Sequence, residues 1–172
     1  MKKTLLIMLL AIVATLTATA QSLTAKDWGA ETEGYKGASI SIVTSFETDD
    51  TCTMLMFLDQ TIERGEVMMA MVAPGTYTFD GHNLRLKIDT KKADFYDDID
   101  MKASNKNLSN KMNHVMKQEI EKAVPGLKQR FLGIVDDYSN LTVTKLTHDK
   151  MVTTIGTFAG YDKGTLRSLL TD

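Results

Sequence analysis

The sequence predicts a β-rich α+β domain, in which an antiparallel meander of strands forms a barrel or half-barrel with one inserted helical pair. Two observations lead to this fold class. Five strand-like segments follow one another before any helical pattern appears, and two or more strands come after it. The links between these segments are short, which favours antiparallel pairing over the long crossovers that a parallel sheet needs.

Composition sets the size and class of the protein. The chain has 172 residues, of which 43% are apolar and 24% charged, and this suits one domain with an ordinary core. The formal net charge of −2 gives no electrostatic reason to expect a nucleic-acid partner. One Cys and three His exclude a disulfide framework and a cysteine-based zinc finger.

The first twenty residues have the pattern of a secretory signal peptide. Lys2 and Lys3 precede an apolar run over 5–16, and small residues at 18–20 would allow cleavage after Ala20. The run is too short to cross the ~30 Å hydrocarbon core of a bilayer, and no second run of about 18 apolar residues follows. We therefore expect a signal peptide at 1–20 and a single domain at 21–172. The mature protein would be soluble, without a membrane span, in the bacterial periplasm or outside the cell.

The meander begins after a polar segment at 21–37, which we interpret as a leader pinned by Trp28. Residues 40–46 alternate apolar with small polar side chains, as a half-buried strand does. The next two strands, 51–59 and 66–73, have unbroken apolar centres, so both of their faces should be buried. One face would meet the barrel interior, and the helical pair would cover the other.

The clearest hairpin comes next, after an entry bend at Pro74-Gly75. Two registers fit its turn residues. Tyr77 faces Leu84 if Asp80-Gly81 is the two-residue loop, and it faces Leu86 if Gly81-His82 is the loop. Either register leaves the same apolar side chains on one face of the hairpin.

A helical pattern replaces the strands in the second half of the chain. Residues 90–107 are charged and are predicted to be a loose loop. Apolar residues at three- and four-residue spacing then predict a helical insertion at about 105–136. Pro125 should end or kink the first helix and begin the second. The segments 141–146 and 151–158 return to period two and form a final hairpin.

Few residues carry the pattern of a reactive site. Four acidic residues cluster without the glycine that an EF-hand calcium loop requires, and a solvated acidic loop explains them better: Asp94, Asp97, Asp98 and Asp100. The three histidines, His82, His114 and His148, form no His-x-x-x-His pair, and no Gly-x-Ser-x-Gly motif is present. We therefore predict no catalytic residues, no metal site and no cofactor.

Methionine is the unusual part of the composition. Five methionines fall in the two doubly apolar strands: Met54, Met56, Met68, Met69 and Met71. Methionine fills irregular gaps in cores and also adapts to apolar ligands, so a filled core and a ligand-lined cavity both remain open. The candidate ligand-binding residues on the predicted inner face are Phe46, Met54, Met56, Tyr77, Phe79, Leu84 and Leu86.

A family resemblance rests on the hairpin motif. The residues Pro74-Gly75-Thr76-Tyr77, which run into Asp80-Gly81-His82-Asn83-Leu84 in an exported meander, resemble uncharacterised exported bacterial lipocalin-like proteins. The resemblance covers about 40–88 and the final hairpin to Phe158. It implies a β-barrel that binds a small apolar ligand or a protein partner. Lipocalins carry Gly-x-Trp near their first strand, whereas this chain has Asp27-Trp28-Gly29.

The expected function is that of an exported, non-enzymatic binding domain. Two alternatives from other classes stay open. One is a small periplasmic hydrolase with a histidine in a cleft, which would need that histidine within reach of a nucleophile and a carboxylate. The other is a structural or interaction module with a filled core.

The signal-peptide pattern makes a direct prediction about the mature N-terminus. N-terminal sequencing of the protein recovered from the periplasm or the medium should begin at Gln21. An intact N-terminus on protein that stays in the cytoplasm would contradict export.

Overall fold

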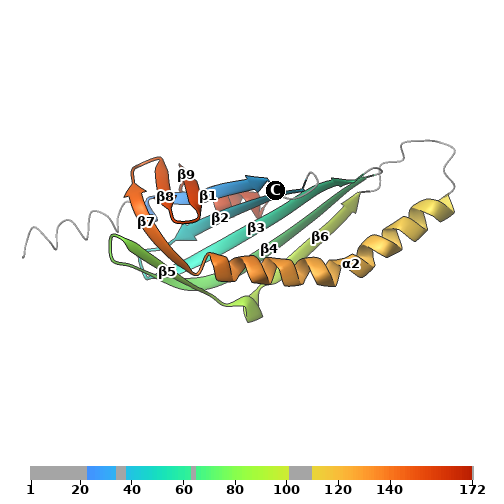
Figure 1. Ribbon diagram of the computed structural model, residues 1–172, viewed down its shortest axis with the longest axis horizontal. Helices are drawn as coiled ribbons and strands as arrows, with labels where there is room; N and C mark the ends of the chain where they lie inside the picture. Colours follow the sequence, from blue (N-terminus) through green and yellow to red (C-terminus); the bar gives the residue numbers. More distant parts are fainter. Residues whose placement is uncertain (1–22, 34–37, 63–64, 101–109, 172) are drawn as a thin grey trace, which may run out of the picture.

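The computed structural model describes residues 23–33, 38–62, 65–100 and 110–171. The signal-peptide prediction lies outside these residues. Strands dominate the chain, and Figure 1 shows their arrangement. The elements are β1 (Lys26–Glu33), β2 (Ala38–Phe46), β3 (Thr51–Ile62), β4 (Gly65–Phe79), β5 (Asn83–Ile88), η2 (Thr90–Lys92), β6 (Asp94–Asp100), α2 (Asn110–Asp137), β7 (Asn140–Leu146), β8 (Lys150–Thr153), β9 (Gly156–Asp162) and α3 (Thr165–Leu169).

Eight strands form a closed antiparallel barrel, which confirms the predicted β-rich fold class. Neighbours around the ring are β1, β2, β3, β4, β5, β7, β8 and β9. The ring closes where β9 pairs with β1, from Lys26 opposite Asp162 to Gly29 opposite Ala159. The ninth strand, β6, pairs with β4 beyond the ring and extends the sheet past the barrel (Figure 1). Two strands, β1 and β6, were predicted as a leader and a loop and are corrected here.

β4 is one strand of 15 residues, although the sequence predicted a bend at Pro74-Gly75. On one edge it pairs with β3 from Gly65 to Thr76, without a break at Pro74. On the other edge it pairs with β6 up to Val72 and with β5 from Gly75 onward. Pro74 lies between these two ladders, and its carbonyl accepts a hydrogen bond of 2.8 Å from the Asp89 N–H. The missing N–H of Pro74 therefore faces a gap in the pairing, where no ladder bond is lost.

The β4–β5 hairpin adopts the second of its two predicted registers. Tyr77 lies opposite Leu86, and the two-residue loop is Gly81-His82. Gly81 has a φ of 94°, which glycine adopts without strain. The Asp80 carboxylate accepts hydrogen bonds from the Asn83 side chain and from the backbone N–H groups of Asn83 and His82. These bonds lower the pKa of Asp80 to about 2, so the turn stays fixed across the physiological pH range.

The predicted helical pair is a single helix. α2 runs from Asn110 to Asp137 and passes through Pro125. A proline removes one backbone hydrogen bond from a helix interior, but packing can outweigh that loss. The half of α2 after Pro125 is anchored by Phe131 and Val135, which are 2% and 5% exposed. Tertiary burial therefore keeps the helix continuous where the local sequence favours a break.

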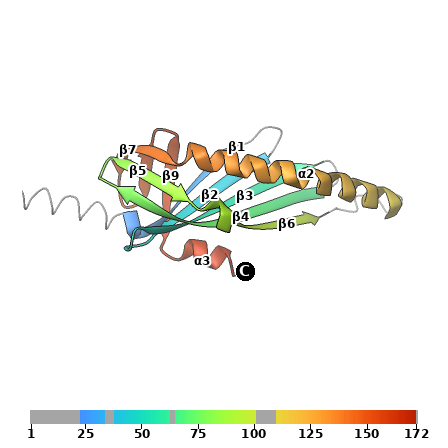
Figure 2. The ribbon, with the colours of Figure 1, turned by 90° about the horizontal axis from the view of Figure 1, so that it is seen from below.

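The helix covers the opposite face from the one expected. Phe131 and Val135 belong to the same buried cluster as Trp28 in the barrel interior, so α2 packs on the inner face of the sheet. The outer face of β2 and β3 is covered instead by α3, whose Leu166 packs on Val43 and Leu55. Figure 2 shows α2 and α3 on opposite sides of the sheet. The doubly apolar strands thus have a helix on each side.

Burial of Phe131 makes the docking of α2 testable. Phe131→Ala should lower the free energy of unfolding by ~3 kcal/mol or more, because a buried aromatic leaves both lost contacts and a cavity. Urea unfolding followed by circular dichroism measures this change. Val115→Ala on the same helix is the control, because Val115 is 50% exposed and should have little effect. An unchanged midpoint for Phe131→Ala would show that α2 is not docked through this residue.

The lone thiol lies in the core. Cys52 is 3% exposed, and burial raises its pKa to about 11. At pH 8 only about one thiol in a thousand is then ionised, and the thiolate is the reactive form. We expect a thiol-reactive disulfide reagent to label the folded protein at least ~100-fold more slowly than the urea-unfolded protein. Similar labelling rates for the two states would contradict the burial of Cys52.

Candidate functional site

The candidate ligand-binding residues from the sequence meet in the barrel interior. Six of them are buried, and Phe79 packs against the cluster: Phe46, Met54, Met56, Tyr77, Leu84 and Leu86. The Phe46 and Tyr77 rings make an edge-to-face contact at 4.8 Å between centroids. The Tyr77 hydroxyl donates a hydrogen bond of 2.7 Å to the Glu47 carbonyl. The protein itself thus provides the polar partner that this hydroxyl needs when the interior is filled.

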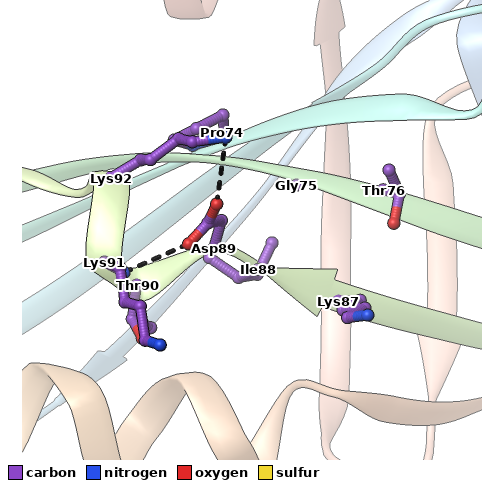
Figure 3. A pocket seen from close by; sticks show the side chains of 9 residues that line it. All are labelled: Pro74, Gly75, Thr76, Lys87, Ile88, Asp89, Thr90, Lys91 and Lys92. Carbon is purple, nitrogen blue, oxygen red and sulfur yellow. Dashed lines mark hydrogen bonds and ion pairs between the residues drawn. The ribbon is translucent and has the colours of Figure 1, made fainter.

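An opening lies on the outer surface, where the pairing partner of β4 changes from β6 to β5. The five residues after β5 leave the edge of β4, form η2, and return as β6. This excursion leaves a cavity of about 640 Å³, which we call the η2 pocket. Its walls, shown in Figure 3, are Pro74, Gly75, Thr76, Lys87, Ile88, Asp89, Thr90, Lys91 and Lys92.

The charge of the η2 pocket differs from that of the chain. Three ammonium groups line it against the one carboxylate of Asp89. Lys91 and Lys92 lie on one side of the pocket and Lys87 on the other (Figure 3). Asp89 pairs with Lys92 at 3.2 Å and also accepts the Lys91 backbone N–H at 3.3 Å. Within the described residues, the ammonium groups of Lys87 and Lys91 form no ion pair, so the pocket is locally basic.

The floor of the η2 pocket is apolar and closely packed. Pro74, Gly75 and Ile88 form it. A Cβ at Gly75 would lie 2.8 Å from both the Ile88 Cδ1 atom and the Lys87 carbonyl oxygen, so only glycine lets the two strands approach here. An apolar floor beneath unpaired ammonium groups suits a small molecule that joins an anionic group to an apolar body.

The histidines do not assemble a hydrolytic site in the part of the chain that the structure describes. The His82 Nδ1 atom lies 3.1 Å from the Val143 carbonyl oxygen. The His114 Nε2 atom lies 3.2 Å from the Gln118 amide nitrogen. Neither contact joins a histidine to a nucleophile and a carboxylate, so the described contacts lend the hydrolase alternative no support.

The described residues contain neither a candidate metal site nor a candidate membrane-spanning helix. No group of three or more His, Cys, Asp or Glu side chains there is placed to hold a metal ion. The acidic cluster from Asp94 to Asp100 forms strand β6, where the sequence predicted a loop. No helix in the described ranges combines the length and the apolar character needed to cross a membrane.

Sequence reasoning missed the η2 pocket. Its lysines fall in the run Lys87-Ile88-Asp89-Thr90-Lys91-Lys92, and such a charged run is usually only a solvated surface. The informative signal is Pro74, which is distant in sequence and forces a gap opposite this run. To recognise the pocket, one must know that β4 continues as one strand through Pro74.

Comparison with known proteins leaves the fold and the site as the basis for a function, because no family model matches the chain and no curated protein matches it either.

Proposed function

We propose that this chain is a non-enzymatic binding domain, and that the η2 pocket binds a small molecule with an anionic group on an apolar body. The observation that carries this proposal is the set of three lysines, opposed by one carboxylate, around an apolar floor. The cavity of about 640 Å³ is within the usual size range of small-molecule sites.

Electrostatics favour an anion in the η2 pocket even though the chain has a net charge of −2. Low-dielectric walls concentrate the field of nearby charges, so an anion gains more in a pocket than on a flat surface. Lys87 and Lys91 form no ion pair with the described residues, whereas Lys92 is partly neutralised by Asp89. The attraction should weaken as salt rises, because these ammonium groups stay in contact with water.

The proposal agrees with the sequence. The signal-peptide pattern supports export, where a binding domain would meet ligands outside the cytoplasm. The lipocalin-like resemblance implies ligand binding, although it points to an apolar ligand inside the barrel. A ligand there would have to displace the Phe46–Tyr77 contact and the Tyr77 hydrogen bond, so we favour the η2 pocket.

A dye titration tests the site. Fluorescence of the anionic dye anilinonaphthalene sulfonate should report saturable binding at low salt. The double variant Lys87→Gln/Lys91→Gln should raise its Kd about five- to ten-fold, since two exposed charge contacts of up to ~1 kcal/mol each are lost. The matched control Lys145→Gln/Lys150→Gln removes two exposed lysines of the β7–β8 hairpin and should leave the Kd unchanged.

A second dye separates the pocket from the barrel interior. Uncharged phenylnaphthylamine and the Tyr77→Ala variant report on an apolar interior site. If both dyes bind the wild type, if Tyr77→Ala weakens both, and if the lysine variants weaken neither, the ligand enters the barrel and the η2 pocket proposal is wrong. A cooperative thermal transition above the assay temperature shows that each variant remains folded.

A further inference from the structure

The ammonium group of Lys163 lies among four oxygen atoms at the other side of the barrel. Lys163 follows β9, and its Nζ donates hydrogen bonds to Ser45 Oγ at 2.7 Å and to the Phe46 carbonyl at 2.7 Å. It also contacts Glu47 Oε1 at 2.8 Å and Asp27 Oδ1 at 3.6 Å. We call these four oxygens the oxygen cradle. Asp27 lies in β1, Ser45 and Phe46 lie at the end of β2, and Glu47 follows β2.

The cradle has more acceptors than Lys163 can satisfy. A lysine ammonium has three hydrogens, and the three short contacts use them all. The fourth acceptor, Asp27 Oδ1, is completely buried and has no hydrogen-bond partner among the described residues. The other carboxylate oxygen, Oδ2, accepts the backbone N–H groups of Gly164 at 3.1 Å and Leu166 at 2.9 Å. A buried acceptor without a donor is costly, and the Lys163 ammonium group stays 3.6 Å from Asp27 Oδ1, whereas an ammonium group without a tether is free to move closer to it.

The size of the cradle identifies the kind of cation it suits. Contacts of 2.7–2.8 Å match charge-assisted hydrogen bonds from an ammonium nitrogen to oxygen. Calcium would need distances of about 2.3–2.6 Å and magnesium about 2.0–2.1 Å. Two carboxylates, Asp27 and Glu47, face the single positive charge of Lys163. The contact distances therefore favour a primary ammonium group, and the two carboxylates balance its charge together with that of Arg167, which lines the adjoining cavity.

We propose that the oxygen cradle is a binding site for small primary amines, which Lys163 fills as a tethered ligand and which a free amine can occupy in its place. One third of the Lys163 side chain is exposed, so the cradle can be reached from solvent when this side chain moves. A cavity of about 410 Å³ adjoins the cradle and is lined also by Thr53, Arg167 and Leu170. It provides room for the body of the amine.

Chemical rescue of a truncated lysine tests this site. Lys163→Ala empties the cradle and should lower the melting temperature. Methylammonium chloride should then raise that temperature by ~2–4 °C more than it does for the wild type, by binding the folded state. Tetramethylammonium chloride at the same concentration has no N–H donor and should not do so. The control is Lys26→Ala, because the ion pair that Lys26 forms within the described residues is with the exposed Asp162, and its loss leaves no cradle.

The proposal is overturned if methylammonium does not rescue Lys163→Ala, or if tetramethylammonium or the Lys26→Ala variant shows the same gain. A measurement on the wild type covers the case in which Lys163→Ala does not fold. The NMR signal of the labelled Lys163 ammonium group should shift in a saturable way with methylammonium and not with tetramethylammonium. A signal that responds equally to both salts would also overturn the proposal.

Discussion

The continuity of strand β4 through Pro74 is the constraint on which the rest of the structure depends. β4 pairs with β3 from Gly65 to Thr76, and this unbroken ladder keeps the strand continuous through Pro74. On its other edge the proline cannot donate a hydrogen bond, so the facing chain leaves the sheet, forms η2 and returns. β5 then closes the barrel while β6 extends the sheet, and the gap between them becomes the η2 pocket. One residue without an N–H thus separates the barrel from its extension and creates the candidate binding site.

Apolar residues on both faces of β3 and β4 follow from the same arrangement. Their inner faces complete the barrel core and continue beneath α2, which docks there through Phe131. Their outer faces meet α3, which is held by Leu166 and by the buried carboxylate of Asp27. Neither helix would be stable in isolation, because Pro125 removes a backbone hydrogen bond from α2 and α3 has only five residues. Both helices therefore depend on packing against the barrel for their stability.

Period-two patterns in the sequence were sufficient to predict the strands that alternate clearly, the β4–β5 hairpin and the antiparallel barrel. They were insufficient for β1 and β6. β1 is polar in composition, and the buried carboxylate of its Asp27 is satisfied by two backbone N–H groups from the distant C-terminal segment. β6 is acidic, as suits an edge strand. The candidate site shows the same limit. Tyr77 and its apolar neighbours are predictable as one face, whereas the lysines of the η2 pocket and the oxygens around Lys163 come together only through long-range pairing.

Cross-strand NMR contacts test the continuity of β4 most directly. Contacts from β4 to both β6 and β5 should be observed in one sample. These are Met71 with Phe95 on the β6 side of Pro74, and Tyr77 with Leu86 on the β5 side. Contacts from Thr53 of β3 to Pro74 should be present at the same time. The account predicts all three sets of nuclear Overhauser effects. Loss of the Met71–Phe95 and Thr53–Pro74 contacts, with the Tyr77–Leu86 contact retained, would show that the chain bends at Pro74-Gly75 and would contradict it.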